Sequence, residues 1–170
     1  VDQTMGYFKA GFFTIGGQSV LISRTGWTGE LGYEIYTLGQ NTDYQRLWDE
    51  LIHSGKKYGM VFSSMQAMNI RRIEAGILDS GSDFDASMAP GEAGLQRFVD
   101  KNKKYFIGHE AINKRNKDKR IHGVLTGGYV PKSGDLVHDG KNALGYVTTG
   151  AYSPAFEAGI GYVRFNIAED

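Results

Sequence analysis

The chain has 170 residues, enough for one domain or two small ones with a buried core. Its 19 Lys and Arg residues balance its 19 Asp and Glu residues, which argues against nucleic acid or an anionic membrane as the main partner. The sequence contains no cysteine, which excludes disulfides and thiolate catalysis and fits a reducing compartment. Because the four histidines are scattered, no metal site is expected.

The first 37 residues predict short strands joined by glycine-rich turns. Gly16-Gly17 separates apolar runs at 11–15 and 18–23, a signal for a two-residue β-hairpin. The following segment, 23–37, reads Ser-Arg-Thr-Gly-Trp-Thr-Gly-Glu-Leu-Gly-Tyr-Glu-Ile-Tyr-Thr and predicts a turn that enters a strand over 31–37.

Glycine recurs at every third position of that turn, which lets the backbone approach another group closely. Two interpretations remain open. The segment is either a tight turn before an edge strand whose polar side faces water, or a site where Trp27 and Glu34 face a flat, polar ligand.

Two helices follow. A capping box that begins at Thr42 precedes apolar residues at helical spacing from Tyr44, and Gly55 is the predicted end. A second capping box that begins at Ser63 opens a helix that reaches about Ala75.

Arg72 lies on the predicted apolar face of this second helix, together with Met65 and Met68. A guanidinium cannot be deprotonated, and a buried, unpaired one is strongly destabilising. Arg72 must therefore reach solvent or meet an anion, for which Glu34, Glu74 and a bound carboxylate are candidates. A structural ion pair and a ligand contact both remain open.

The second half of the chain predicts loops, one short helix and then strands. The acidic loop at 79–94 lacks the glutamate that an EF-hand requires, so calcium binding is rejected. A short helix is expected at 109–114, and a charge-dense boundary follows at 115–120. Beyond it, Asp139-Gly140 predicts a hairpin and 159–165 a last strand.

Five sequence blocks, in this order, resemble those of the glycine cleavage T-protein (aminomethyltransferase) family. They are residues 23–36, 70–76 (Ile-Arg-Arg-Ile-Glu-Ala-Gly), 90–95 (Pro-Gly-Glu-Ala-Gly-Leu), 104–108 (Lys-Tyr-Phe-Ile-Gly) and 145–154 (Gly-Tyr-Val-Thr-Thr-Gly-Ala-Tyr-Ser-Pro). One block alone is a weak signal, but five collinear blocks over nearly the whole chain are a strong one.

The resemblance implies an α+β fold, part of the folate-binding T-protein fold followed by a small carboxy-terminal β-barrel. On this basis residues 1–85 are expected to be a folate-binding region that is incomplete at its amino-terminal side. Residues 86–118 would be a connecting loop and short helix, and residues 119–170 a truncated barrel.

The family's reaction is the transfer of a one-carbon unit to tetrahydrofolate from an aminomethyl group on a lipoylated carrier protein of the glycine cleavage system. By resemblance, Trp27 would lie against the folate, where tyrosine is usual, and Glu34 would hydrogen-bond the pterin. Arg72 would pair with the anionic benzoyl-glutamate end. The family works in the cytoplasm, or in the mitochondrial matrix of eukaryotes.

Family members are longer, and their aspartate beside the reacting nitrogen would lie upstream of Val1. The chain is therefore expected to be a carboxy-terminal portion that is inactive by itself. One alternative is a folate-dependent demethylase, or the folate domain of a dimethylglycine or sarcosine dehydrogenase. Another is a non-catalytic, folate-binding accessory protein of iron–sulfur assembly, whose hallmark cysteine is absent here.

Overall fold

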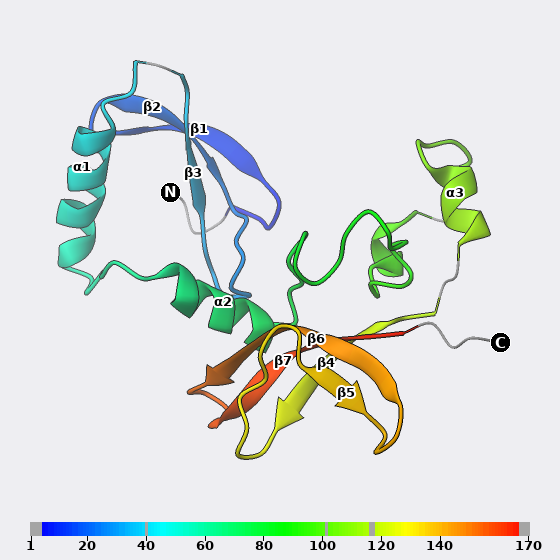
Figure 1. The fold of residues 1–170 in the computed structure, drawn as a ribbon. Coiled ribbons are helices and arrows are strands. Elements are labelled where there is room, and N and C mark those ends of the chain that lie inside the picture. Colours follow the sequence, from blue (N-terminus) through cyan, green and yellow to red (C-terminus); the bar gives the residue numbers. More distant parts are fainter. Residues whose placement is uncertain (1–4, 40, 101, 116–117, 167–170) are drawn as a thin grey trace. The chain divides into compact units, whose positions relative to one another are not determined.

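A computed structural model of the chain describes residues 5–39, 41–100, 102–115 and 118–166 (Figure 1). Contacts divide the chain into two compact units, residues 1–72 and 73–170. This division falls inside a helix, and each unit is described by itself. The three functional regions expected from the sequence, with bounds at 85 and 118, stay a prediction. Within the described ranges, no helix is long and apolar enough to cross a bilayer.

The first unit contains an antiparallel sheet of order β1-β2-β3. Its strands are β1 (Ala10–Ile15), β2 (Gln18–Ser23) and β3 (Glu34–Thr37). The predicted hairpin is confirmed, because Gly16 and Gly17 connect β1 to β2 with φ of 56° and 79°, the positive values that this turn requires. β3 begins three residues later than predicted, since β2 ends at Ser23, the partner of Glu34, and offers no further residue for pairing.

Helix α1 (Tyr44–Lys56) packs against this sheet through Leu47 and Leu51, whereas Tyr44 and Trp48, at the same predicted helical spacing, are exposed. The core of the unit consists of Val20, Ile22 and Leu47, with Phe13, Ile15, Tyr33 and Leu51 packed around them. The helix begins one residue later than a cap at Thr42 would place it. Asp43 is the N-cap, and its carboxylate accepts a 3.0 Å hydrogen bond from the amide of Arg46. A negative charge at this end also interacts favourably with the helix dipole.

Helix α2 (Met65–Glu74) is capped by Ser64, whose hydroxyl accepts from the amide of Ala67 at 3.1 Å. The predicted cap at Ser63 is therefore wrong by one residue. Arg72 and Ile73 are the buried positions of α2, whereas Met65 is exposed. The burial of Arg72 was expected from its position on the helix. Met65 lies on the same predicted face but is exposed, so this face is not a continuous core surface.

The second unit contains an antiparallel sheet of order β4-β7-β6-β5. Its elements are η1 (Gln96–Phe98), α3 (His109–Lys114), β4 (Ile121–Thr126), β5 (Leu136–His138), β6 (Ala143–Ser153) and β7 (Ala158–Phe165). The hairpin predicted at Asp139-Gly140 is confirmed between β5 and β6. The α+β class is confirmed as well. The barrel is not, because β4 and β5 remain edge strands among the described residues.

Buried acids fasten the loops of this unit to its sheet. Asp83 is fully buried and accepts hydrogen bonds from the hydroxyls of Thr148 and Thr149 in β6, each at 2.7 Å. Its other carboxylate oxygen accepts from the amide of Asp79 at 2.8 Å. The acidic loop that begins at Asp79 is thus held to the sheet by hydrogen bonds to one carboxylate.

Glu92 does the same for the block Pro-Gly-Glu-Ala-Gly. It is 2% exposed and accepts from the amide of Ala89 at 2.7 Å, while Arg120 lies 3.2 Å and Arg115 3.8 Å from its oxygens. Burial acts to raise the pKa of the Glu92 carboxyl. The amide and the two positive charges outweigh it, so the pKa lies below its ordinary value.

The substitution Glu92→Gln should therefore lower the free energy of unfolding at pH 7 by about 3 kcal/mol, because it leaves Arg120 without its buried partner. A lowered folded-state pKa contributes stability that is present above the unfolded pKa and lost as pH falls through the folded pKa. The difference between the two proteins should accordingly shrink below about pH 4.5. Urea unfolding between pH 3 and pH 7 measures it.

Glu110→Gln is the matched control, since Glu110 is exposed and pairs with Lys114 one helical turn away. It should change the free energy of unfolding by less than about 0.5 kcal/mol at every pH. Equal effects of the two substitutions would contradict the structural role of Glu92.

Candidate functional site

Arg72 and Trp27, two of the three residues predicted to bind a ligand, are in contact. The guanidinium carbon of Arg72 lies 5.4 Å from the centre of the Trp27 ring, within the range of a cation–π interaction. Its Nε donates a 2.8 Å hydrogen bond to the side-chain oxygen of Asn69, one turn earlier in α2. Arg72 is 1% exposed, whereas the indole is half-buried. The cation thus lies beneath a ring that still has surface in contact with solvent.

A second contact joins the same two segments. Glu30, in the glycine-rich turn, forms an ion pair with Arg71, the residue before Arg72 in α2. Both side chains are substantially exposed, at 65% and 43%. Exposed pairs contribute little stability by themselves, so this pair adds orientation more than energy. Neighbouring residues of one turn of α2 therefore contact Trp27 and Glu30, three positions apart in the glycine-rich turn.

Glu34, the third predicted residue, lies at the start of β3 and is exposed. Its carboxylate accepts a hydrogen bond from the hydroxyl of Thr25, which is itself 2.8 Å from the hydroxyl of Ser23. Ser23 is also the cross-strand partner of Glu34. The Thr25 hydroxyl, itself hydrogen-bonded to Ser23, thus restrains an exposed carboxylate that would otherwise sample several rotamers.

The first unit thus contains an aromatic ring beside a buried cation and, in a separate contact, an exposed carboxylate that accepts from Thr25. An aromatic ring can stack on a flat heterocycle, and a carboxylate can accept paired N–H donors. Across the described ranges, no group of three or more His, Asp and Glu side chains is placed to hold a metal ion.

Thr25, Glu30, Asn69 and Arg71 are parts of the site that the sequence analysis did not single out. Thr25 and Glu30 lie in the segment that drew attention for its glycines, and Arg71 lies beside Arg72. Thr25 lies 9 residues before its partner Glu34, and Glu30 lies 41 residues before its partner Arg71. No local sequence pattern indicates contacts at such separations. Asn69 could have been found, because it lies three residues before Arg72 on a helix.

A sequence profile described as the GCVT N-terminal domain matches residues 1–103 of the chain, more than half of its length. The chain belongs to the GCVT family. The matched region includes Trp27, Glu34 and Arg72 and three of the five sequence blocks, and the resemblance to the family is thereby confirmed.

Curated GCVT relatives agree with this assignment. An aminomethyltransferase of Caldanaerobacter subterraneus subsp. tengcongensis is 35% identical over 168 residues, which cover 94% of this chain and 44% of the relative. An aminomethyltransferase of Alkaliphilus oremlandii is 38% identical over 161 residues, covering 92% of this chain and 43% of the relative. The chain thus spans less than half the length of these GCVT relatives.

The fold is similar to that of a solved GCVT structure as well. The crystal structure of glycine cleavage system aminomethyltransferase T from Bartonella henselae matches with a TM-score of 0.75 at 25% identity. The match covers 88% of this chain and 42% of the Bartonella chain.

The contact between Arg72 and Trp27 can be tested by quenching of fluorescence. In a Trp48→Phe background, Trp27 is the one remaining tryptophan of the sequence. Arg72→Lys replaces a planar guanidinium by a compact ammonium that cannot lie flat against the ring. We expect Trp27 to become more accessible to acrylamide, with a higher Stern–Volmer constant.

Arg71→Lys serves as the control, because it keeps the charge beside Glu30 and leaves the indole contact untouched. Its Stern–Volmer constant should equal that of the Trp48→Phe parent protein. Indistinguishable constants for the two lysine variants would show that Arg72 does not shield the ring.

Proposed function

We propose that this GCVT chain forms the tetrahydrofolate-binding part of an aminomethyltransferase of the glycine cleavage system. Such an enzyme transfers the carbon of an aminomethyl group on the lipoyl arm of a carrier protein to tetrahydrofolate, which gives methylene-tetrahydrofolate, ammonia and the free dihydrolipoyl thiol. The attachment of the glycine-rich turn to α2 is the observation that carries the proposal, because it places Trp27 beside a buried cation. The choice of reaction is supported by the relatives, which are named aminomethyltransferases.

In this proposal Trp27 stacks on the pterin and Glu34 accepts hydrogen bonds from its adjacent N–H groups. The Thr25 hydroxyl orients that carboxylate before the ligand arrives. Arg72 is proposed to pair with the anionic benzoyl-glutamate end, and its contact with Trp27 supports placing both residues in one site. A guanidinium fork matches a carboxylate better than an ammonium would.

Transfer of a one-carbon unit depends mainly on positioning two reactants and stabilising the charge that develops between them. The residues of this chain would supply the positioning. A ring held by stacking and by a carboxylate fixed at one edge has little freedom to rotate, which limits the orientations of its reactive nitrogen. Prior orientation of Glu34 by Thr25 lowers the entropic cost of binding.

Binding of tetrahydrofolate to the chain tests the proposed site. Loss of a hydrogen bond to a charged group costs about 1.5–3 kcal/mol, so Glu34→Gln should raise the Kd in titration calorimetry about 10- to 100-fold. Glu50→Gln, at an exposed position of α1, is the matched control and should leave the Kd unchanged. Absence of binding by the unaltered chain would refute the proposed folate site, and equal affinities of both variants would remove Glu34 from it.

The choice of reaction needs a separate assay on the complete protein that carries this chain. We expect methylene-tetrahydrofolate to form from an aminomethyl-lipoyl carrier and not from dimethylglycine. The opposite preference would assign the chain to a folate-linked demethylase or dehydrogenase while leaving the folate site intact.

A further inference from the structure

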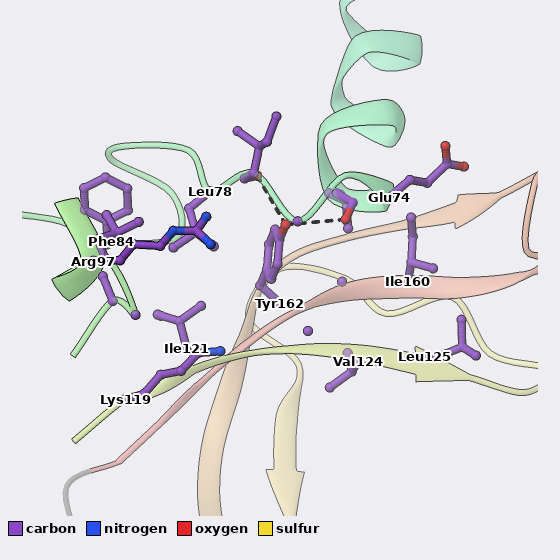
Figure 2. A pocket seen from close by; sticks show the side chains of 18 of the residues that line it. Glu74, Leu78, Phe84, Arg97, Lys119, Ile121, Val124, Leu125, Ile160 and Tyr162 are labelled. Carbon is purple, nitrogen blue, oxygen red and sulfur yellow. Dashed lines mark hydrogen bonds between the residues drawn. The ribbon is translucent and has the colours of Figure 1, made fainter. Parts of the chain in front are cut away.

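We propose that a cavity in the second unit binds a small organic anion with an apolar body, such as an aromatic carboxylate. The cavity has a volume of about 690 Å³ and lies among β4, β7, η1 and the segment that follows α2 (Figure 2). Its lining residues all belong to the unit formed by residues 73–170. The proposal does not depend on the folate site.

The walls of the cavity are mainly apolar. Ile121 and Val124 line it from β4, Ile160 from β7, and Leu78 and Phe84 from the segment that follows α2 (Figure 2). Small-molecule sites are typically hollows of about 300–1,000 Å³ with apolar walls and a few placed polar groups. The size and lining therefore suit a small molecule with a hydrophobic body.

Tyr162 contributes a ring to the cavity while its hydroxyl is directed at the backbone. The hydroxyl lies 3.3 Å from the carbonyl oxygen of Ile77 and 3.4 Å from that of Ile73, and it donates toward both (Figure 2). The hydroxyl therefore has hydrogen-bond acceptors within the protein. The tyrosine therefore presents mainly an apolar surface to a ligand.

The charged groups of the lining are two cations and one acid. Arg97 and Lys119 lie on the same side of Tyr162, and Glu74 lies on the other (Figure 2). Glu74 already accepts a hydrogen bond from the buried hydroxyl of Ser153, at 2.5 Å. Glu74 is thus engaged in the structure, and the cationic side remains the place where a ligand's charge is favoured.

Arg97 and Lys119 differ from three arginines of this unit. Arg115 and Arg120 pair with Glu92, and Arg164 pairs with Asp85. In the part of the chain that the structure describes, no carboxylate forms an ion pair with Arg97 or Lys119. Arg97 instead lies over the ring of Phe98 at 4.8 Å. Two exposed cations on one side of an apolar cavity, with no ion pair to a described carboxylate, favour an anionic ligand.

The rim of the cavity exposes large apolar side chains. Phe98, Leu125 and Phe156 are 69%, 68% and 56% exposed. A ligand whose apolar body reached this rim would remove part of that surface from water, at about 25 cal/mol per Å². The chemical class that matches all these features is an amphipathic monoanion.

Two aromatic probes of nearly equal shape test the proposal, 2-naphthoate with its carboxylate and 2-naphthamide without a charge. We expect the unaltered chain to bind naphthoate with a Kd on the order of tens of micromolar, and naphthamide about tenfold more weakly. The double variant Arg97→Gln and Lys119→Gln should weaken naphthoate about tenfold and leave naphthamide unchanged. The control double variant Lys56→Gln and Lys141→Gln removes the same amount of charge away from the cavity. It should leave the Kd of both probes unchanged.

Filling the cavity provides a second arm that is independent of charge. Gly123 in β4 lines the cavity, and a Cβ added there would meet no atom within 4 Å, so Gly123→Leu can be accommodated by the strand. It should abolish binding of both probes. Gly127→Leu, which also has open space but does not line the cavity, should bind both normally.

The proposal is overturned if naphthoate does not bind, or if it binds no more tightly than naphthamide. It is also overturned if the double variant and Gly123→Leu leave the naphthoate Kd unchanged while circular dichroism shows an intact fold. Neither result would affect the folate site, which is tested by tetrahydrofolate and Glu34.

Discussion

A permanent positive charge at a buried position imposes the main constraint on the first unit. Arg72 cannot lose its proton, and it is almost completely removed from solvent. Two contacts stabilise this charge. Asn69, one turn earlier in the helix, accepts a hydrogen bond from it, and the ring of Trp27, distant in sequence, makes a cation–π contact with it. Because the indole belongs to the glycine-rich turn, a favourable environment for the cation also determines where that turn packs. The ion pair of Arg71 with Glu30 strengthens the same association.

The second unit uses the opposite charge in the same way. Asp83 and Glu92 are buried acids, and each draws donors from segments distant in sequence. Burying a carboxylate is unfavourable unless hydrogen bonds and positive charges compensate, so these contacts have to form together. In both units, therefore, a buried ion selects one arrangement of a loop that has few apolar side chains of its own. This explains how a chain so rich in loops keeps a defined structure around its sheets.

Local chemistry made much of the fold predictable. Both hairpins were foreseen because their turns contain glycines, Gly16, Gly17 and Gly140, with the positive φ that other residues avoid. The helix starts were each wrong by one residue, since neighbouring side chains at 42–43 and 63–64 can all cap a helix and only tertiary packing chooses between them. The start of β3 depended on where its partner strand ended. The predicted barrel needs strand pairing that is not present among the described residues.

The candidate sites were also only partly predictable from the sequence, because the sequence does not show which charged side chains pair with each other. With 19 basic and 19 acidic residues, the sequence indicates only that charges balance overall. The structure shows that they do not balance locally, since Arg115, Arg120 and Arg164 have acidic partners whereas Arg97 lies over an aromatic ring. A paired cation holds segments together, and its charge is largely used within the protein. A cation that lies over an aromatic ring keeps much of its attraction for an anion. Which cations could recognise a ligand is thus decided by tertiary contacts, and composition cannot reveal it.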